Sequence, residues 1–297
     1  FLLASHARQS SSLLATLGNT LLEQGRLEEA LAAAEQGLRQ LEDLRDNDDA
    51  LRLLEICDEA CSRMSLHDRA LEFATQWFAL RRTRSRQLWL ELTMFAERLL
   101  ESGKLERALE TVSEAVDLLA AEDETLPYGG QAHPLTLLAD IHRALGDTAK
   151  AATAMREAVR AYRGLIADGR PWWSTGELAE TLLSLAGDLE ELGNPEALDH
   201  ILEAIDIFEQ VDASPGKYPA NLTNALNRLG DYAATRSMYE LATTAYARVL
   251  ILAEPFPART SEPVLEIERR LDATCRESGT GLDDALARGR QPITART

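Results

Sequence analysis

Apolar residues recur with a helical period along most of the chain. Leu, Ile, Val and Ala return every three or four positions, and charged residues fill the positions between them. This spacing predicts amphipathic α-helices, each with one stripe to bury. Stretches rich in Pro, Gly or Asp interrupt the pattern at residues 46–49, 127–130, 169–171, 214–219 and 255–257. We therefore expect an all-α chain whose helices are separated by turns.

One unit repeats six times within this pattern. In the first copy an apolar helix carries Leu17-Gly18 and Leu21, a turn follows at Gly25, and Ala30 lies five residues beyond the turn. The corresponding turn residues of the six copies are Gly25, Ser65, Gly103, Gly146, Gly193 and Ser237. They lie 38 to 47 residues apart, a regularity that indicates a repeat architecture.

The repeat predicts helical hairpins stacked into an α-α superhelix, or solenoid, that occupies residues 1–297 as a single domain. The predicted hairpins span 11–46, 51–85, 89–122, 132–168, 177–212 and 221–254, with a partial seventh at 262–290. Two antiparallel helices need small side chains where their backbones approach. A single hairpin cannot bury its apolar stripe, whereas stacked neighbours can. The second hairpin has Asp58 and Trp77 where small residues are expected, so either its residues are assigned to the wrong repeat positions or its two helices splay apart.

These residues resemble the tetratricopeptide repeat family. The resemblance covers roughly residues 11 to 278, with a spacing longer than the standard 34 residues. It is similar to the longer-helix variety found in actinobacterial repeat arrays and in kinesin-light-chain-like proteins; Ala161-Tyr162-Arg163, Pro171 and the segment 177–182 look especially like the actinobacterial form. The resemblance implies a bacterial scaffold, commonly attached to large signalling NTPases or caspase-like proteins.

Composition narrows the choice of compartment and partner. The formal net charge of −18 repels nucleic acid and anionic membranes, so neither is expected as a partner. Three cysteines cannot pair completely, which favours free thiols in the reducing cytoplasm. No stretch is long and apolar enough to span a bilayer. Because the first residue is Phe1 within an apolar pattern, we expect the sequence to be a segment of a longer protein.

The resemblance also implies where a partner binds, since the first helix of each hairpin lines the concave groove in this family. Two positions per first helix, one turn apart, face that groove, and one of the resulting rows is mostly acidic. The candidate binding residues are Asn19, Glu55, Glu59, Glu97, Asp140, Arg143, Asn224, Asn227 and Asp231. An acidic groove would take a basic or amide-rich extended segment of a protein or peptide. The alternative is a solvated helix face in an acidic protein.

Three other groups have a functional and a structural interpretation. The arginines at 81, 82, 84 and 86 could bind an acidic partner, or could cap a helix and pair with acids such as Glu91. Cys57 and Cys61 have a spacing that could chelate a metal, but they fall on core positions and no further ligands are evident, so no metal is predicted. Trp172-Trp173 could anchor a partner or fill a gap between hairpins.

The sequence contains no phosphate loop, nucleophile elbow, zinc-protease helix or dinucleotide fingerprint. We therefore predict no enzyme activity and no cofactor. The first hypothesis is a protein- or peptide-binding scaffold, part of a larger signalling or regulatory protein. The second is a regulator whose curvature changes when it binds a small peptide or effector.

Overall fold

The structure is a computed structural model, and it describes residues 2–41, 44, 47–82, 85, 87–121, 132–169, 173–211, 219–256, 262–291 and 293. Side chains of residues 2–9, 173 and 174 lie outside this description. Within the described residues the chain forms fourteen α-helices and no strand, which confirms the all-α prediction.

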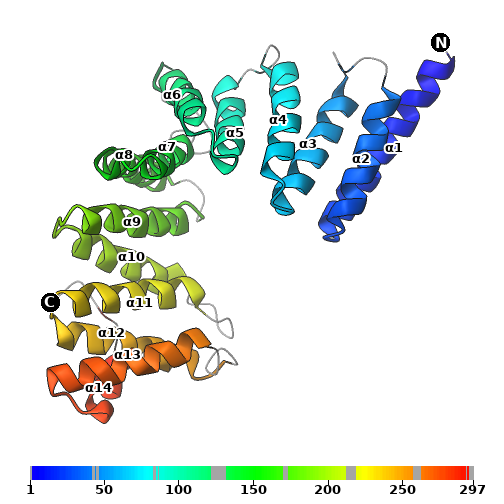
Figure 1. Cartoon of the computed structure of the whole chain (residues 1–297). Helices are drawn as coiled ribbons and strands as arrows, with labels where there is room; N and C mark the ends of the chain where they lie inside the picture. Colours follow the sequence, from blue (N-terminus) through cyan, green and yellow to red (C-terminus); the bar gives the residue numbers. More distant parts are fainter. Residues whose placement is uncertain are drawn as a thin grey trace. The chain divides into compact units, whose positions relative to one another are not determined.

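The helices follow one another as first and second members of hairpins (Figure 1). Their bounds are α1 Leu2–Glu23, α2 Leu27–Gln40, α3 Asp48–Arg63, α4 His67–Arg81, α5 Leu88–Glu101, α6 Leu105–Ala121, α7 Ala132–Ala144, α8 Thr148–Ala167, α9 Trp173–Glu191, α10 Ala197–Val211, α11 Ala220–Thr235, α12 Tyr239–Ala253, α13 Glu262–Ser278 and α14 Leu282–Gly289. The seventh, weaker copy of the repeat is a hairpin as well, with a short second helix.

The chain divides into two compact units, Phe1–Gly146 and Asp147–Thr297. In the first unit, α1 packs on α2, α3 on α4 and α5 on α6, and each second helix also contacts the first helix of the next hairpin, up to α7. In the second unit, α8 packs on α9, followed by the hairpins α9–α10, α11–α12 and α13–α14. Each unit thus buries its apolar stripes between neighbouring hairpins. The prediction of one continuous array over residues 1–297 stays a prediction.

Every predicted turn residue adopts the left-handed conformation that ends a first helix. Glycines 25, 103, 146 and 193 have φ between 66° and 79°, and Ser65 and Ser237 have φ of 59° and 60°. Gly279, in the partial seventh hairpin, has a φ of 68°. Beyond the turn, backbone N–H groups close the helix end: Arg26 N donates to Leu21 O at 2.9 Å, and equivalent six-residue bonds recur at the turns after α3, α5, α9 and α11. This is the Schellman arrangement, in which the left-handed residue satisfies the last helical carbonyls.

The alanine that follows each turn lies at the helix–helix contact. Residues 30, 70, 108, 151, 197 and 242 are all alanine and all completely buried. Close packing leaves no space at such a contact for a longer side chain. The prediction that small residues mark the packed positions is confirmed.

The helices of the second hairpin do not splay apart, since α3 packs on α4 as α1 packs on α2 and α5 on α6. Trp77 is 7% exposed and its indole N–H donates to Glu55 Oε1 at 2.8 Å, so the large ring fits without separating the helices. Asp58 is half-buried because it pairs with the next hairpin. A second difference concerns α1, which begins at Leu2 and not at the predicted residue 11. Residues 2–10 contain no Pro or Gly that would stop a helix earlier.

Candidate functional site

All nine predicted binding residues lie on first helices. We call the surface formed by the first helices of each unit its first-helix face: α1, α3, α5 and α7 in the first unit, and α9, α11 and α13 in the second. Among the described residues, ion pairs join successive first helices at four junctions. Many of the predicted residues therefore contact another residue of the same chain as well as solvent.

At the α3–α5 junction, Arg98 gathers carboxylates from both helices. Its Nε donates to Asp58 Oδ1 and Oδ2 at 2.8 and 3.0 Å, and Nη1 donates to Glu101 at 3.1 Å. The predicted site residue Glu59 lies 3.6 Å from Arg98 Nη2. Burial raises the pKa of Asp58 to about 6, although Arg98 acts in the opposite direction. Glu59 thus contributes its charge to an internal network.

The α5–α7 junction pairs two more of the predicted acids. Glu97 Oε1 lies 2.9 Å from the Nε2 atom of His133, which is at the start of α7. Further along α7, Arg143 Nη1 donates to Asp140 Oδ1 at 2.6 Å, one helical turn away. Asp140 and Arg143 are therefore brought together, but as a pair within one helix.

Asp231 is the most tightly held of the predicted residues. Its Oδ1 accepts from Tyr246 OH at 2.6 Å, and both carboxylate oxygens accept from Arg270 Nη1 of α13, at 2.6 and 2.9 Å. Gly230 makes this possible, since a Cβ there would lie 2.3 Å from the Tyr246 ring. Burial raises the pKa of the Tyr246 hydroxyl, and its bond to Asp231 adds to that effect. Asp231 fixes α11 against α12 and α13.

The three asparagines among the predicted residues are less constrained. Asn19 on α1 and Asn224 on α11 are exposed. Asn227 is half-buried, and its Oδ1 has no hydrogen-bond partner in the described structure. Asn224 and Asn227 share a face of α11 with Asp231, because positions three and four apart are neighbours on a helix. The exposed amides of Asn19 and Asn224 can bond to the backbone of an extended segment, whereas the Oδ1 atom of Asn227 is buried.

The fourth junction, between α9 and α11, is weakly joined. Glu190 Oε1 lies 3.5 Å from Arg228 Nε, and neither atom makes a hydrogen bond. The Arg228 guanidinium extends over Gly187, where a Cβ would lie only 2.5 Å from Nη2.

Sequence reasoning missed the basic partners Arg98, His133, Arg228 and Arg270. The sequence carried a signal for two of them: Arg228 and Arg270 each immediately precede the repeated Leu of their first helix. Such a recurrence identifies an equivalent position, but which residue of the previous hairpin it meets depends on how the hairpins stack.

The other groups singled out in the sequence have structural roles where they are described. Arg81 Nε donates to Glu91 Oε1 at 3.0 Å, which confirms the predicted pairing. Cys57 and Cys61 are completely buried, and burial raises the pKa of Cys57 to about 12. The described residues contain no cluster of potential metal ligands. Trp172, Arg84, Arg86 and the Trp173 side chain lie outside the described residues.

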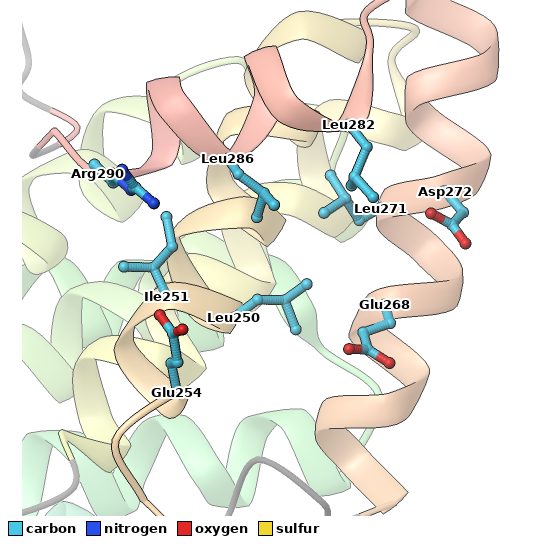
Figure 2. Close-up of a pocket in the computed structure, with 9 residues that line it drawn as sticks. All are labelled: Leu250, Ile251, Glu254, Glu268, Leu271, Asp272, Leu282, Leu286 and Arg290. Atoms are coloured by element: carbon cyan, nitrogen blue, oxygen red, sulfur yellow. The ribbon is translucent and has the colours of Figure 1, made fainter.

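A cavity of about 330 Å³ lies between α12, α13 and α14. Figure 2 shows Leu282 and Leu286 of α14 directed toward Leu250 and Ile251 of α12, with Leu271 of α13 beside them. The charged lining residues are Glu254, Glu268, Asp272 and Arg290. Aliphatic walls with a mostly acidic rim suit an apolar group that carries a positive charge. Among the described helices, none combines the length and apolar character needed to cross a membrane.

One segment of the chain matches a known repeat family. The family model for the tetratricopeptide repeat matches residues 132–164, which cover α7 and most of α8. No curated protein matches the sequence.

Several solved structures share the fold. BtubC (BKLC) from P. vanneervenii is 20% identical, with a TM-score of 0.56 over 77% of this chain and 88% of that chain. A kinesin light chain from Podospora anserina with nearly identical TPR-like repeats is 18% identical, with a TM-score of 0.57 over 70% and 99%. The apo form of RapI is 16% identical, with a TM-score of 0.57 over 91% and 99%. At these identities the likeness concerns the fold alone. The chain is an all-α protein of consecutive helical hairpins, one of which matches the tetratricopeptide repeat model.

Proposed function

We propose that this protein is a non-catalytic scaffold that binds another protein or peptide through its first-helix face. The observation that carries the proposal is the joining of successive first helices by ion pairs, at α3–α5 and α5–α7 in one unit and at α9–α11 and α11–α13 in the other. Side chains at equivalent positions of adjacent helices therefore form rows, and a row of this kind matches the regular spacing of an extended segment.

The exposed asparagine side chains on the first-helix face indicate which groups of a bound segment they can hydrogen-bond. Asn19 and Asn224 project from the first-helix face, whereas the unpartnered Oδ1 atom of Asn227 is buried. Backbone amides of an extended peptide are suitable partners for the two exposed side chains. A basic segment remains part of the proposal, but it must compete with Arg98, His133 and Arg270 for the predicted acids. Attachment to a larger signalling protein is likewise part of the proposal.

The test compares charge changes on the two surfaces of each unit. Partners are first captured from the native lysate with the wild-type chain, and their affinities are then measured by calorimetry. We expect Asn19→Arg or Asn224→Arg to weaken binding at least tenfold without lowering the melting temperature, because both residues are exposed. The matched controls are Gln36→Arg on α2 and Gln210→Arg on α10, both exposed on second helices. Equal affinities for all four variants would refute a role for the first-helix face.

The cavity between α12, α13 and α14 favours a second candidate, a ligand-responsive regulator. A small apolar cation bound there would contact three helices at once. Leu286→Trp should fill the cavity and remove any change in scattering radius that an effector causes. Persistence of the change in this variant would exclude the cavity as the effector site.

A further inference from the structure

Helix α1 exposes a face that every later first helix buries. Leu13 is 72% exposed, the largest value for any large apolar side chain in the described part of the chain, and Leu17 is 49% exposed. Leu13 lies twelve residues before the turn residue Gly25. The residues twelve positions before the six later turn residues are all buried: Leu53, Glu91, Pro134, Thr181, Ala225 and Ile267.

Helix α3 shows what covers the equivalent face in the next hairpin. Four of its residues there are at most 2% exposed: Leu53, Ile56, Cys57 and Ala60. They pack on the preceding hairpin, since a Cβ at Gly37 of α2 would lie 2.8 Å from the Leu53 side chain. The matching residues of α1, which we call its outer face, are all exposed: Leu13, Thr16, Leu17 and Thr20. The outer face of α1 is therefore shaped to pack on another helix.

An apolar surface can cover the outer face of α1 without burying an unpaired donor. The Thr16 hydroxyl donates to Ser12 O, and the Thr20 hydroxyl donates to Thr16 O, both at 3.0 Å. Both hydroxyl protons are thus bonded within α1, and the threonine methyl groups are available for packing. Desolvation of these side chains leaves no hydroxyl proton without an acceptor.

Charge indicates which apolar surface fits. The segment from Gln9 to Leu22 contains no Asp, Glu, Lys or Arg, although the whole chain has a formal net charge of −18. Two copies of the chain repel each other over an acidic surface, but not where two neutral α1 helices meet. Helix α14, in contrast, exposes Asp283, Asp284 and Arg288. Packing α14 of another copy against α1 would bury charges that the neutral face cannot pair.

We propose that two copies of this chain associate through the outer faces of their α1 helices, as an antiparallel pair with two-fold symmetry. A two-fold axis midway between residues 13 and 17 places Leu13 of one copy against Leu17 of the other, twice. Thr16 and Thr20 are smaller, so they let the two helices approach closely. This inference goes beyond the proposed function and does not depend on it, because Asn19 lies about 120° around α1 from Leu13.

The first experiment measures the mass of the whole chain by sedimentation equilibrium between about 2 and 200 µM. One helix from each copy gives a small interface, below about 1,200 Å² in total, so we expect a reversible dimer with a Kd on the order of 10–100 µM. Leu13→Glu should weaken the dimer at least tenfold, because it places an unpaired charge in the contact. The matched control is Leu192→Glu, at an equally accessible leucine (48% exposed) in the turn after α9, which should leave the Kd unchanged.

Three results would overturn the proposal: a monomer at the highest concentration, a dimer that persists in Leu13→Glu, or equal weakening by Leu192→Glu. A monomer is also the result expected if the outer face of α1 binds a helix of a different protein. Because Leu13 is exposed, Leu13→Glu should melt as the wild type does at about 1 µM, where neither associates. Weakening of the dimer is then not a consequence of unfolding.

The second experiment tests the antiparallel arrangement by pairing charges across the contact. Leu17→Lys alone should also be monomeric, but an equimolar mixture with Leu13→Glu should form a heterodimer, since residue 13 of one copy meets residue 17 of the other. Native mass spectrometry distinguishes the heterodimer from either homodimer. A mixture that stays monomeric would refute the antiparallel pair. Neither experiment bears on the scaffold function, which the substitutions at Asn19 and Asn224 test with a protein partner.

Discussion

At the scale of single residues, the fold depends on a few positions where space is short. The buried alanine after each turn and Gly230 beneath Tyr246 are such positions. In each case the neighbouring helix, and not the local sequence, sets the upper limit on side-chain size.

Ala108→Arg should lower the free energy of unfolding by at least about 3 kcal/mol, because a charged chain at a closed helix–helix contact causes overpacking and buries a charge. Ala108 is completely buried, whereas Glu110 on the same helix is exposed. Chemical denaturation of Glu110→Arg provides the control, with an expected change within about 0.5 kcal/mol. Similar midpoints for the two variants would mean that Ala108 does not face the contact.

The Asp58–Arg98 pair should make stability depend on pH. The pKa of Asp58 is raised to about 6 from its usual 3.8, so its protonated form is favoured by folding. The stabilisation that comes from protonated Asp58 is fully present below about pH 3.8, and it is lost as the carboxyl ionises when the pH rises through about 6.

Arg98→Ala should therefore lower the free energy of unfolding by more at pH 8 than at pH 5. At pH 8 it leaves the half-buried Asp58 charge unpaired, with a cost of about 2 kcal/mol or more. At pH 5 Asp58 is protonated, since removal of Arg98 raises its pKa further. Denaturation curves at both pH values measure the difference, and Asp58→Asn in the same background should remove it. If Arg98→Ala lowers the free energy of unfolding by the same amount at both pH values, Arg98 does not stabilise the ionised form of Asp58.

At the scale of elements, two features define each hairpin: a left-handed residue that ends the first helix, and ion pairs that join it to the next hairpin. Second helices are bridged as first helices are, for example Arg69 to Glu35 at 2.6 Å and Arg163 to Glu203 at 2.7 Å. These second-helix pairs are partly exposed, so each contributes little, on the order of 0.2–1 kcal/mol. Their role is to complement the apolar packing, which supplies most of the stability.

Ser65→Gly should stabilise the protein by about 0.5–1 kcal/mol, because a residue with a Cβ is strained at a φ of 59° and glycine is not. The reverse change, Gly103→Ala at a φ of 69°, should destabilise by about 1 kcal/mol. A Cβ at Gly103 would have no neighbouring atom within 4 Å, so the cost of alanine there is conformational and not steric. Thermal melting of the two variants checks that Ser65→Gly raises the melting temperature and Gly103→Ala lowers it. If both substitutions lower it, Ser65 is not in a left-handed turn.

At the scale of the whole molecule, charge is the dominant property. The sequence has 49 acidic residues against 31 Lys and Arg, for a formal net charge of −18. Several of the basic side chains are already paired with acids of a neighbouring hairpin. The remaining acidic side chains face solvent and repel one another.

Raising NaCl from about 10 mM to about 300 mM should increase the melting temperature by a few degrees, because salt screens the long-range repulsion more than the close, partly buried pairs. Differential scanning calorimetry in the two salts measures the shift. A decrease would mean that the ion pairs between hairpins outweigh the net repulsion.

Much of the architecture could be predicted from local residues. The left-handed turns at Gly25 and Ser65, the buried alanines and the pairing of Arg81 with Glu91 all depend on neighbours that are close in the sequence or on the repeat itself. The acidic row could not be interpreted in the same way, since Glu97 and Asp231 meet His133 and Arg270, 36 and 39 residues later.

The sequence by itself determined the helices, their ends and their grouping into hairpins, because these depend on periodicity, backbone conformation and side-chain size within about 40 residues. Only the tertiary structure decided which charges are already paired and which donors remain open. That outcome depends on the offset between adjacent first helices, which aligns Asp231 with Arg270 but places Gly187 beneath Arg228. An offset of one helical turn would pair different residues without altering the repeat pattern.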